Sequence, residues 1–167
     1  MIMRTIRSVA VALALTAVTA IALNQTLRAG SPPLPVQADG VVRVKSAYGV
    51  EETIARLKTD IAGKGIMFFT AIDQAKLAAD AGITLRPSTL LMFGNPPLGT
   101  QFITASPAAG LDWPVRLLVT QDETGTVWAV YTDFQWIARR HGITTRDAQF
   151  KTASDVVTSI TASVAAK

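Results

Sequence analysis

The stretch VRLLVTQDETGTVWAVYT (residues 115–132) decides the fold class of this chain. Residues 115–120 and 126–132 are apolar runs rich in β-branched residues, which favour strands. The turn-forming residues from Asp122 to Gly125 separate them, and Gly125 supplies the positive φ that such a hairpin requires. The stretch therefore predicts two antiparallel strands joined by a tight turn.

Three further strands are predicted outside this hairpin. Residues 41–45 (VVRVK) alternate apolar and basic side chains, which is typical of a half-buried strand. Residues 66–70 (IMFFT) and 89–93 (TLLMF) are short apolar runs, and the turn residues GNPP (94–97) end the second.

Two long helices are predicted from apolar residues that recur every three or four positions. The first spans residues 50–61, and the second spans residues 150–164 after Thr144 and Asp147, whose spacing resembles a capping box. The stripes are Val50, Ile54, Leu57 and Ile61 in the first helix, and Phe150, Ala153, Val156, Val157, Ile160 and Val164 in the second.

Shorter helical segments are predicted over residues 73–82, with Asp73 as the cap, and over 134–140, and a small irregular or helical segment is predicted over 98–110. The order is then strand, helix, four strands and helix. Because the strands are grouped, we predict an α+β fold with an antiparallel β-α-β(4)-α sheet and helices on one face, rather than a doubly wound fold.

Residues 1–38 predict a targeting segment. The apolar run at 8–23 (SVAVALALTAVTAIAL) would span only about 24 Å as a helix, against a hydrocarbon core of about 30 Å. The Pro-rich linker SPPLP (31–35) leads to a candidate cleavage site after Ala38, and a second candidate site follows Ala29. We expect a cleaved signal peptide and a periplasmic or secreted single domain at 39–167; the alternative is an uncleaved inner-membrane anchor with the domain outside.

The composition excludes several classes of function. The net charge of +4 belongs largely to residues 1–38, which hold three arginines and no acidic residue, and the rest carries 13 basic and 12 acidic residues. Such a nearly neutral domain lacks the charge of a nucleic-acid-binding protein. The absence of cysteine excludes disulfides, thiolate zinc sites, iron–sulfur clusters and a lipoprotein anchor.

No nucleotide-binding, hydrolase-elbow or metalloprotease motif occurs in the sequence. His141 is the single histidine, so we expect no multi-histidine metal site, and no cofactor is predicted. After two arginines at a predicted helix end, His141 fits a structural role at the negative end of the helix dipole. The alternative is acid–base chemistry with Asp73 or Asp112.

Four segments together resemble the family known as domain of unknown function 302. They are SAYGVEETIARL (46–57), LRPSTLLMFGNPPLGT (85–100), LDWPVRLLV (111–119) and VWAVYTDFQWIARRHGI (127–143). The resemblance implies a fold like one half of the TATA-binding protein, decorated with small helices, and a homodimer. It implies no DNA binding, because a fold does not determine a function.

The chain departs from the family pattern at Gln74, where members often carry histidine, and at Ile103, where they often carry methionine. If a family site uses those side chains as ligands, this member lacks them. The resemblance carries over Asp73, Arg86, Gly94, Asn95, Pro96, Tyr131 and His141, for which it implies no established catalytic role.

We predict a ligand pocket near the loop FGNP (93–96), with Arg86, Asn95 and Tyr131 beside it. Arg86 either clamps an anion or pairs with Asp80 or Asp73. Asn95 either supports the turn or presents its amide at a pocket mouth. The full set of candidate ligand-binding residues is Asp73, Arg86, Gly94, Asn95, Tyr131 and His141.

Three functions remain open from the sequence. The leading hypothesis is a non-enzymatic exported domain that binds a small ligand or a partner as a homodimer, because no nucleophile or cofactor motif is found. The first alternative is an acid–base enzyme that uses Asp73 or Asp112 with His141. The second alternative is a membrane-tethered assembly partner, with the Pro-rich linker as a spacer.

Overall fold

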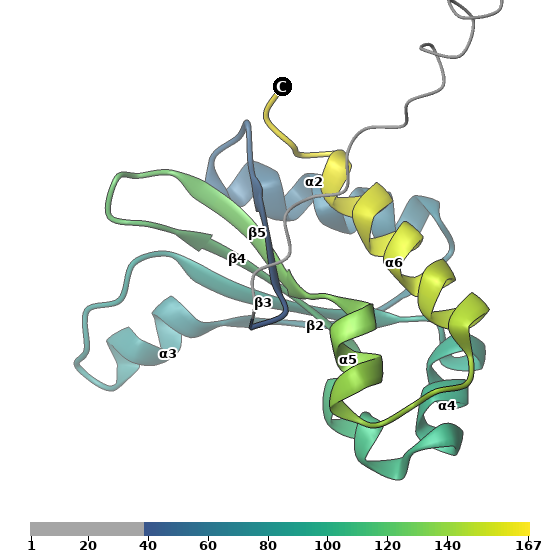
Figure 1. Cartoon of the computed structure of the whole chain (residues 1–167). Coiled ribbons are helices and arrows are strands. Elements are labelled where there is room, and N and C mark those ends of the chain that lie inside the picture. The colour runs from purple at the N-terminus through teal and green to yellow at the C-terminus, as the bar shows by residue number, and fades with distance from the viewer. Residues whose placement is uncertain (1–38) are drawn as a thin grey trace, which may run out of the picture. The chain divides into compact units, whose positions relative to one another are not determined.

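The computed structural model describes residues 39–167 as a five-stranded sheet with helices packed against it (Figure 1). The predicted signal peptide or anchor at 1–38 lies outside the described residues. No helix within 39–167 has the length and hydropathy to cross a bilayer. The elements are β1 (Val41–Lys45), α2 (Val50–Gly63), β2 (Met67–Asp73), α3 (Gln74–Asp80), β3 (Ser88–Gly94), α4 (Pro96–Ala105), the 3-10 helix η2 (Pro107–Asp112), β4 (Val115–Gln121), β5 (Val127–Thr132), α5 (Phe134–Arg140) and α6 (Asp147–Ala162).

The strands lie in the order β1-β5-β4-β3-β2, and all neighbours are antiparallel. The predicted hairpin forms as β4 and β5, which confirms the α+β class and the β-α-β(4)-α order. One row across the sheet joins Val42, Tyr131, Leu117 and Leu91, and all four side chains are buried. This row marks the face of the sheet that carries the core.

Helix α2 covers this face of the sheet (Figure 1). Leu57 and Ile61 are fully buried, as the predicted stripe requires. The buried stripe also includes Thr53, which is fully buried and was not predicted. The predicted member Ile54 is only half-buried. The Thr53 hydroxyl lies 2.6 Å from the Ser46 hydroxyl, and this hydrogen bond satisfies both polar groups in the core.

Helix α6 packs beside α2 and buries Phe150, which confirms the second long helix. Its predicted start was wrong, because Arg146 is the N-cap and no side chain caps the helix. Ile143 is buried against the core, and Arg146 then adopts a left-handed conformation with φ of 73° before the helix begins. Thr144 therefore lies too early in the chain to form a capping box with Asp147.

The short helices lie in two groups, one at each end of the sheet (Figure 1). Helices α4 and α5 lie with η2 at one end, and α3 lies beside β2 and β3 at the other. Helices α3, α4 and α5 each begin at a side chain that accepts a hydrogen bond from the amide three residues on, which stabilises a helix by about 1 kcal/mol. These caps are Asp73, as predicted, Asn95 and Asp133.

The turn between β4 and β5 is built around the carboxylate of Asp122. Gly125 has φ of 81°, as the sequence predicts. Asp122 accepts hydrogen bonds from the Thr124 hydroxyl at 2.6 Å, the Trp128 indole at 2.8 Å, and the amides of Thr126 and Thr124. These bonds, led by that from the Thr124 hydroxyl, lower the pKa of Asp122 from 3.8 to about 2.

We predict an acid-sensitive contribution of this turn to stability. A carboxyl group whose pKa is lower in the folded state stabilises the fold above its unfolded pKa, and this stabilisation is lost as the pH falls from about 3.8 towards 2. Asp122→Asn removes the titrating group. Urea unfolding at pH 6 and pH 2 should show a stability advantage of the wild type at pH 6 that shrinks at pH 2. An advantage of equal size at both pH values would contradict this account.

Candidate functional site

A cavity of about 400 Å³ opens between α6 and the end of the sheet where β3 leads into α4. The buried residues of its lining are apolar and form its floor; they include Phe93 of β3, Phe134 of α5, and Ala153 and Val157 of α6. Val156 lies half-buried beside them. Such a floor suits the apolar body of a small molecule.

The polar residues of this cavity lie at its mouth, because each of them is exposed. They are Lys64, Asn95, Thr152, Asp155 and Ser159. Lys64 pairs with Asp60 at 2.8 Å and Asp155 pairs with Lys151 at 2.6 Å, so both charges at the mouth have partners on neighbouring turns. The cavity thus has an apolar interior and a polar rim.

One wall of the cavity is the indole of Trp113, which lies against two glycines. A Cβ atom at Gly94 or at Gly99 would overlap the ring. Gly94 ends β3 and Gly99 lies in α4, so both elements approach the indole closely. These positions accept only glycine while the indole keeps its place.

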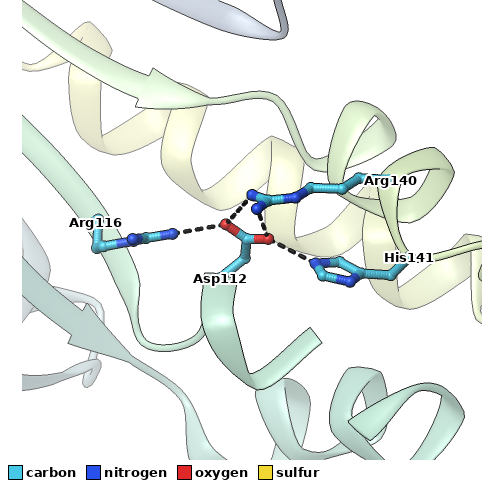
Figure 2. A network of polar contacts seen from close by, with 4 residues as sticks. All are labelled: Asp112, Arg116, Arg140 and His141. Atoms are coloured by element: carbon cyan, nitrogen blue, oxygen red, sulfur yellow. Dashed lines mark hydrogen bonds and ion pairs between the residues drawn. The ribbon is translucent and has the colours of Figure 1, made fainter. Parts of the chain in front are cut away.

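A second candidate site surrounds Asp112, the last residue of η2, whose side chain is only 3% exposed (Figure 2). Its Oδ1 accepts a hydrogen bond from Arg116 Nη2 at 2.6 Å. Nη1 of Arg140 lies 3.2 Å from both carboxylate oxygens, and Nε2 of His141 lies 2.6 Å from Oδ2. One carboxylate therefore joins η2 to the start of β4 and to the end of α5.

The Asp112 carboxylate has no remaining capacity for a substrate. Its four polar contacts fill the roughly four acceptor positions of a carboxylate. The hollow beside Asp112 and Arg116 measures about 10 Å³, which is about the space of one water molecule. This geometry favours a structural anchor over acid–base chemistry.

Comparison with known proteins places the domain in a family. A family model described as "Domain of unknown function DUF302" matches residues 42–165. This chain belongs to the DUF302 family. An uncharacterized conserved DUF302 protein from Bacillus stearothermophilus, known from its crystal structure, shares the fold with a TM-score of 0.62 and 20% sequence identity. The match covers 76% of this chain and 97% of that protein.

Curated relatives include two proteins named fluoride-specific ion channel FluC 1, from Brucella suis biovar 1 (strain 1330) and Brucella abortus biovar 1 (strain 9-941). Each is 38% identical over 113 residues, which is 67% of this chain. The match covers 44% of the first relative and 42% of the second. The chain therefore spans less than half the length of these relatives.

The predicted ligand residues of this DUF302 domain do not all meet. Gly94 and Asn95 line the cavity, whereas Arg86 is exposed in the loop before β3 and forms no ion pair within residues 39–167. Tyr131 lies in the core row of the sheet, where burial raises the pKa of its hydroxyl. The candidate partner Asp80 pairs with Lys76 at 2.7 Å instead of with Arg86.

The two carboxylates proposed as partners of His141 have different places. Asp112 lies 2.6 Å from His141, and both side chains are almost fully buried. Asp73 caps α3 by accepting from the Lys76 amide at 2.9 Å, at the end of the sheet opposite α5 (Figure 1). The structure therefore pairs His141 with Asp112 and not with Asp73.

Sequence reasoning missed Arg116 and Arg140 as partners of Asp112, and it missed α6 as one side of the cavity. Arg140 lies 28 positions from Asp112, and the only signal was its place beside His141 in the stretch RRHG. Val156 lies on the predicted apolar stripe, which indicates burial but not a cavity. Within residues 39–167 no group of three or more histidines or carboxylates is placed to hold a metal ion.

We predict that Asp112→Asn lowers the free energy of unfolding by about 1–3 kcal/mol, because two arginines lose their shared carboxylate. Asp80→Asn is the matched control, since Asp80 pairs with Lys76 on an exposed helix face and such pairs contribute little. Urea unfolding of both variants measures the difference. Equal stability of the two variants would show that the buried network does not anchor η2.

Proposed function

We propose that this DUF302 domain is a non-catalytic binding module that takes a small amphipathic molecule into the cavity between α6 and the sheet. The supporting observation is the division of the cavity into a buried apolar floor and an exposed polar mouth. Its volume of about 400 Å³ lies within the range of small-molecule sites, roughly 300–1,000 Å³.

We infer the chemistry of the ligand from the lining. The apolar body would contact Phe93, Trp113 and Val156, where burial of apolar surface supplies the affinity. A polar end would remain at the mouth near Asn95, whose side-chain oxygen already caps α4 by accepting from the Leu98 amide. The Asn95 NH₂ group is therefore the donor offered to the ligand.

Acid–base catalysis is the weaker proposal. Asp112 and His141 satisfy its first requirement, since they lie within hydrogen-bonding distance. Both side chains are almost fully buried, and neither lines the cavity of about 400 Å³. The hollow next to Asp112 is too small for a substrate.

Filling the cavity tests the binding proposal. Val156→Trp places an indole in the lining, and we predict that it weakens binding of the uncharged fluorescent probe N-phenyl-1-naphthylamine by about tenfold or more, which corresponds to about 1.4 kcal/mol. The matched control is Ala148→Trp, on an exposed position in the first turn of α6. Probe fluorescence is titrated for both variants, with thermal unfolding followed by circular dichroism.

Unchanged affinity in a folded Val156→Trp variant would contradict the placement of the ligand. Equal loss in Ala148→Trp would also contradict it, because that position lies outside the lining.

We further propose that the domain forms a homodimer through β2. This strand is an edge of the sheet, and Met67 and Phe69 are 53% and 42% exposed on it. An exposed apolar edge strand is a template for pairing with another chain. The other edge strand, β1, carries Arg43 and Lys45, and such charges discourage pairing.

Phe69→Lys is predicted to convert this dimer into a monomer, because it places a charge on the pairing edge. Leu111→Lys is the control, since Leu111 is 67% exposed in η2, which is not part of the sheet. Light scattering after size-exclusion chromatography gives the mass of each. A wild type that is monomeric at about 100 μM, or a dimeric Phe69→Lys variant, would reject the interface.

A second candidate function is a partner domain of a membrane protein, favoured by the identity of 38% to part of proteins named fluoride-specific ion channels. In that proposal residues 1–38 remain as an anchor and hold the domain outside the cytoplasm. In the first proposal they are a signal peptide, and the domain is released to the periplasm or beyond. The mass of the chain recovered from its host separates the two.

A further inference from the structure

Two guanidinium groups meet at the Asp112 carboxylate with most of their donors unused. Arg116 contacts the carboxylate through Nη2 alone, and Arg140 contacts it through Nη1 alone. A guanidinium carries five N–H donors, and within residues 39–167 Nε and the second terminal nitrogen of each arginine have no hydrogen-bond partner. The two side chains are 44% and 43% exposed, so part of each is accessible to solvent, although the Arg140 guanidinium also lies 5.4 Å from the centroid of the Trp136 ring.

The charge of this cluster is unbalanced. Asp112 contributes one negative charge, whereas Arg116 and Arg140 contribute two positive charges. Asp112 is the only carboxylate in the described part of the chain that pairs with either arginine. An excess positive charge therefore remains at the surface, even with a neutral His141.

The carboxylate also fixes the relative position of the two arginines. Both donate to the same oxygen, Oδ1, so their contacting nitrogens are held close together (Figure 2). Asp112 is itself held by His141 at 2.6 Å, on the side away from Arg116 (Figure 2). Asp112 and His141 are thus positioning residues for a pair of guanidinium groups.

We propose that the free edges of Arg116 and Arg140 form a binding site for a phosphate group. A tetrahedral oxyanion presents several oxygens at once, which matches the planar pairs of N–H donors that two guanidinium groups offer. The phosphate group can belong to a free anion or to a lipid headgroup, and both present the same oxygens. The site lies outside the apolar cavity, whose lining includes neither arginine, so it does not rest on the function proposed above.

The test measures binding of inorganic phosphate to the full chain by isothermal titration calorimetry at low ionic strength. Arg116→Lys and Arg140→Lys keep the charge and remove the planar donors, and each is expected to weaken phosphate binding about tenfold or more. Arg139→Gln is the matched control: it removes an exposed charge next to Arg140 that does not contact Asp112. Thermal unfolding verifies that each variant is folded.

The source of the phosphate group is tested with vesicles of phosphatidylcholine alone and with added phosphatidylglycerol. A loss of binding in the two lysine variants, with binding retained in Arg139→Gln, supports the site. If the lysine variants lose binding of inorganic phosphate, the natural ligand is a free anion. If they lose binding of the anionic vesicles alone, the natural ligand is a lipid headgroup. Equal losses in all three variants, or no binding of either probe by the wild type, would overturn the proposal.

Discussion

The buried carboxylate of Asp112 is the constraint on which one end of the domain depends. A carboxylate out of water is costly unless it is paired and hydrogen-bonded. Asp112 meets this requirement with Arg116, Arg140 and His141, so η2, β4 and α5 converge on it. The carboxylate thereby connects the consecutive elements η2 and β4 to α5, which follows after β5 in the chain.

This anchor also affects the cavity, because Trp113 is the next residue. Asp112 positions the backbone that carries the Trp113 side chain. Gly94 and Gly99 leave the space that the indole ring occupies. The indole then lines the cavity together with the apolar side chains of α6. The polar network and the apolar cavity are therefore connected through the adjacent residues Asp112 and Trp113.

Much of the fold could be predicted from the sequence, since it follows local patterns. The alternation of apolar and polar residues, together with the turn residues, predicted the strands. The apolar stripe from Val50 to Ile61 predicted α2. Local patterns failed at Thr53, where a hydrogen bond to Ser46 makes a hydroxyl compatible with the core. They also failed at Thr144, which was predicted to cap α6. Ile143 is buried against the core, and α6 begins only after Arg146.

The candidate site was less predictable because it depends on contacts between distant segments. His141 and Asp112 were paired as one alternative, and their burial and the two arginines favour a structural pair. Asn95 was placed at a pocket mouth, but Tyr131 and Arg86 lie elsewhere, since a residue's neighbours across a sheet are set by register and not by motif. The cavity needs α6, which no motif connects to the loop FGNP.

We propose that the cavity of about 400 Å³ holds a small amphipathic molecule in the native protein. The most direct measurement is mass spectrometry of organic extracts from the full chain and from its Val156→Trp variant, each purified gently from the native host. We expect a compound that is extracted with the wild type and absent from the folded variant. Extracts that do not differ would contradict it.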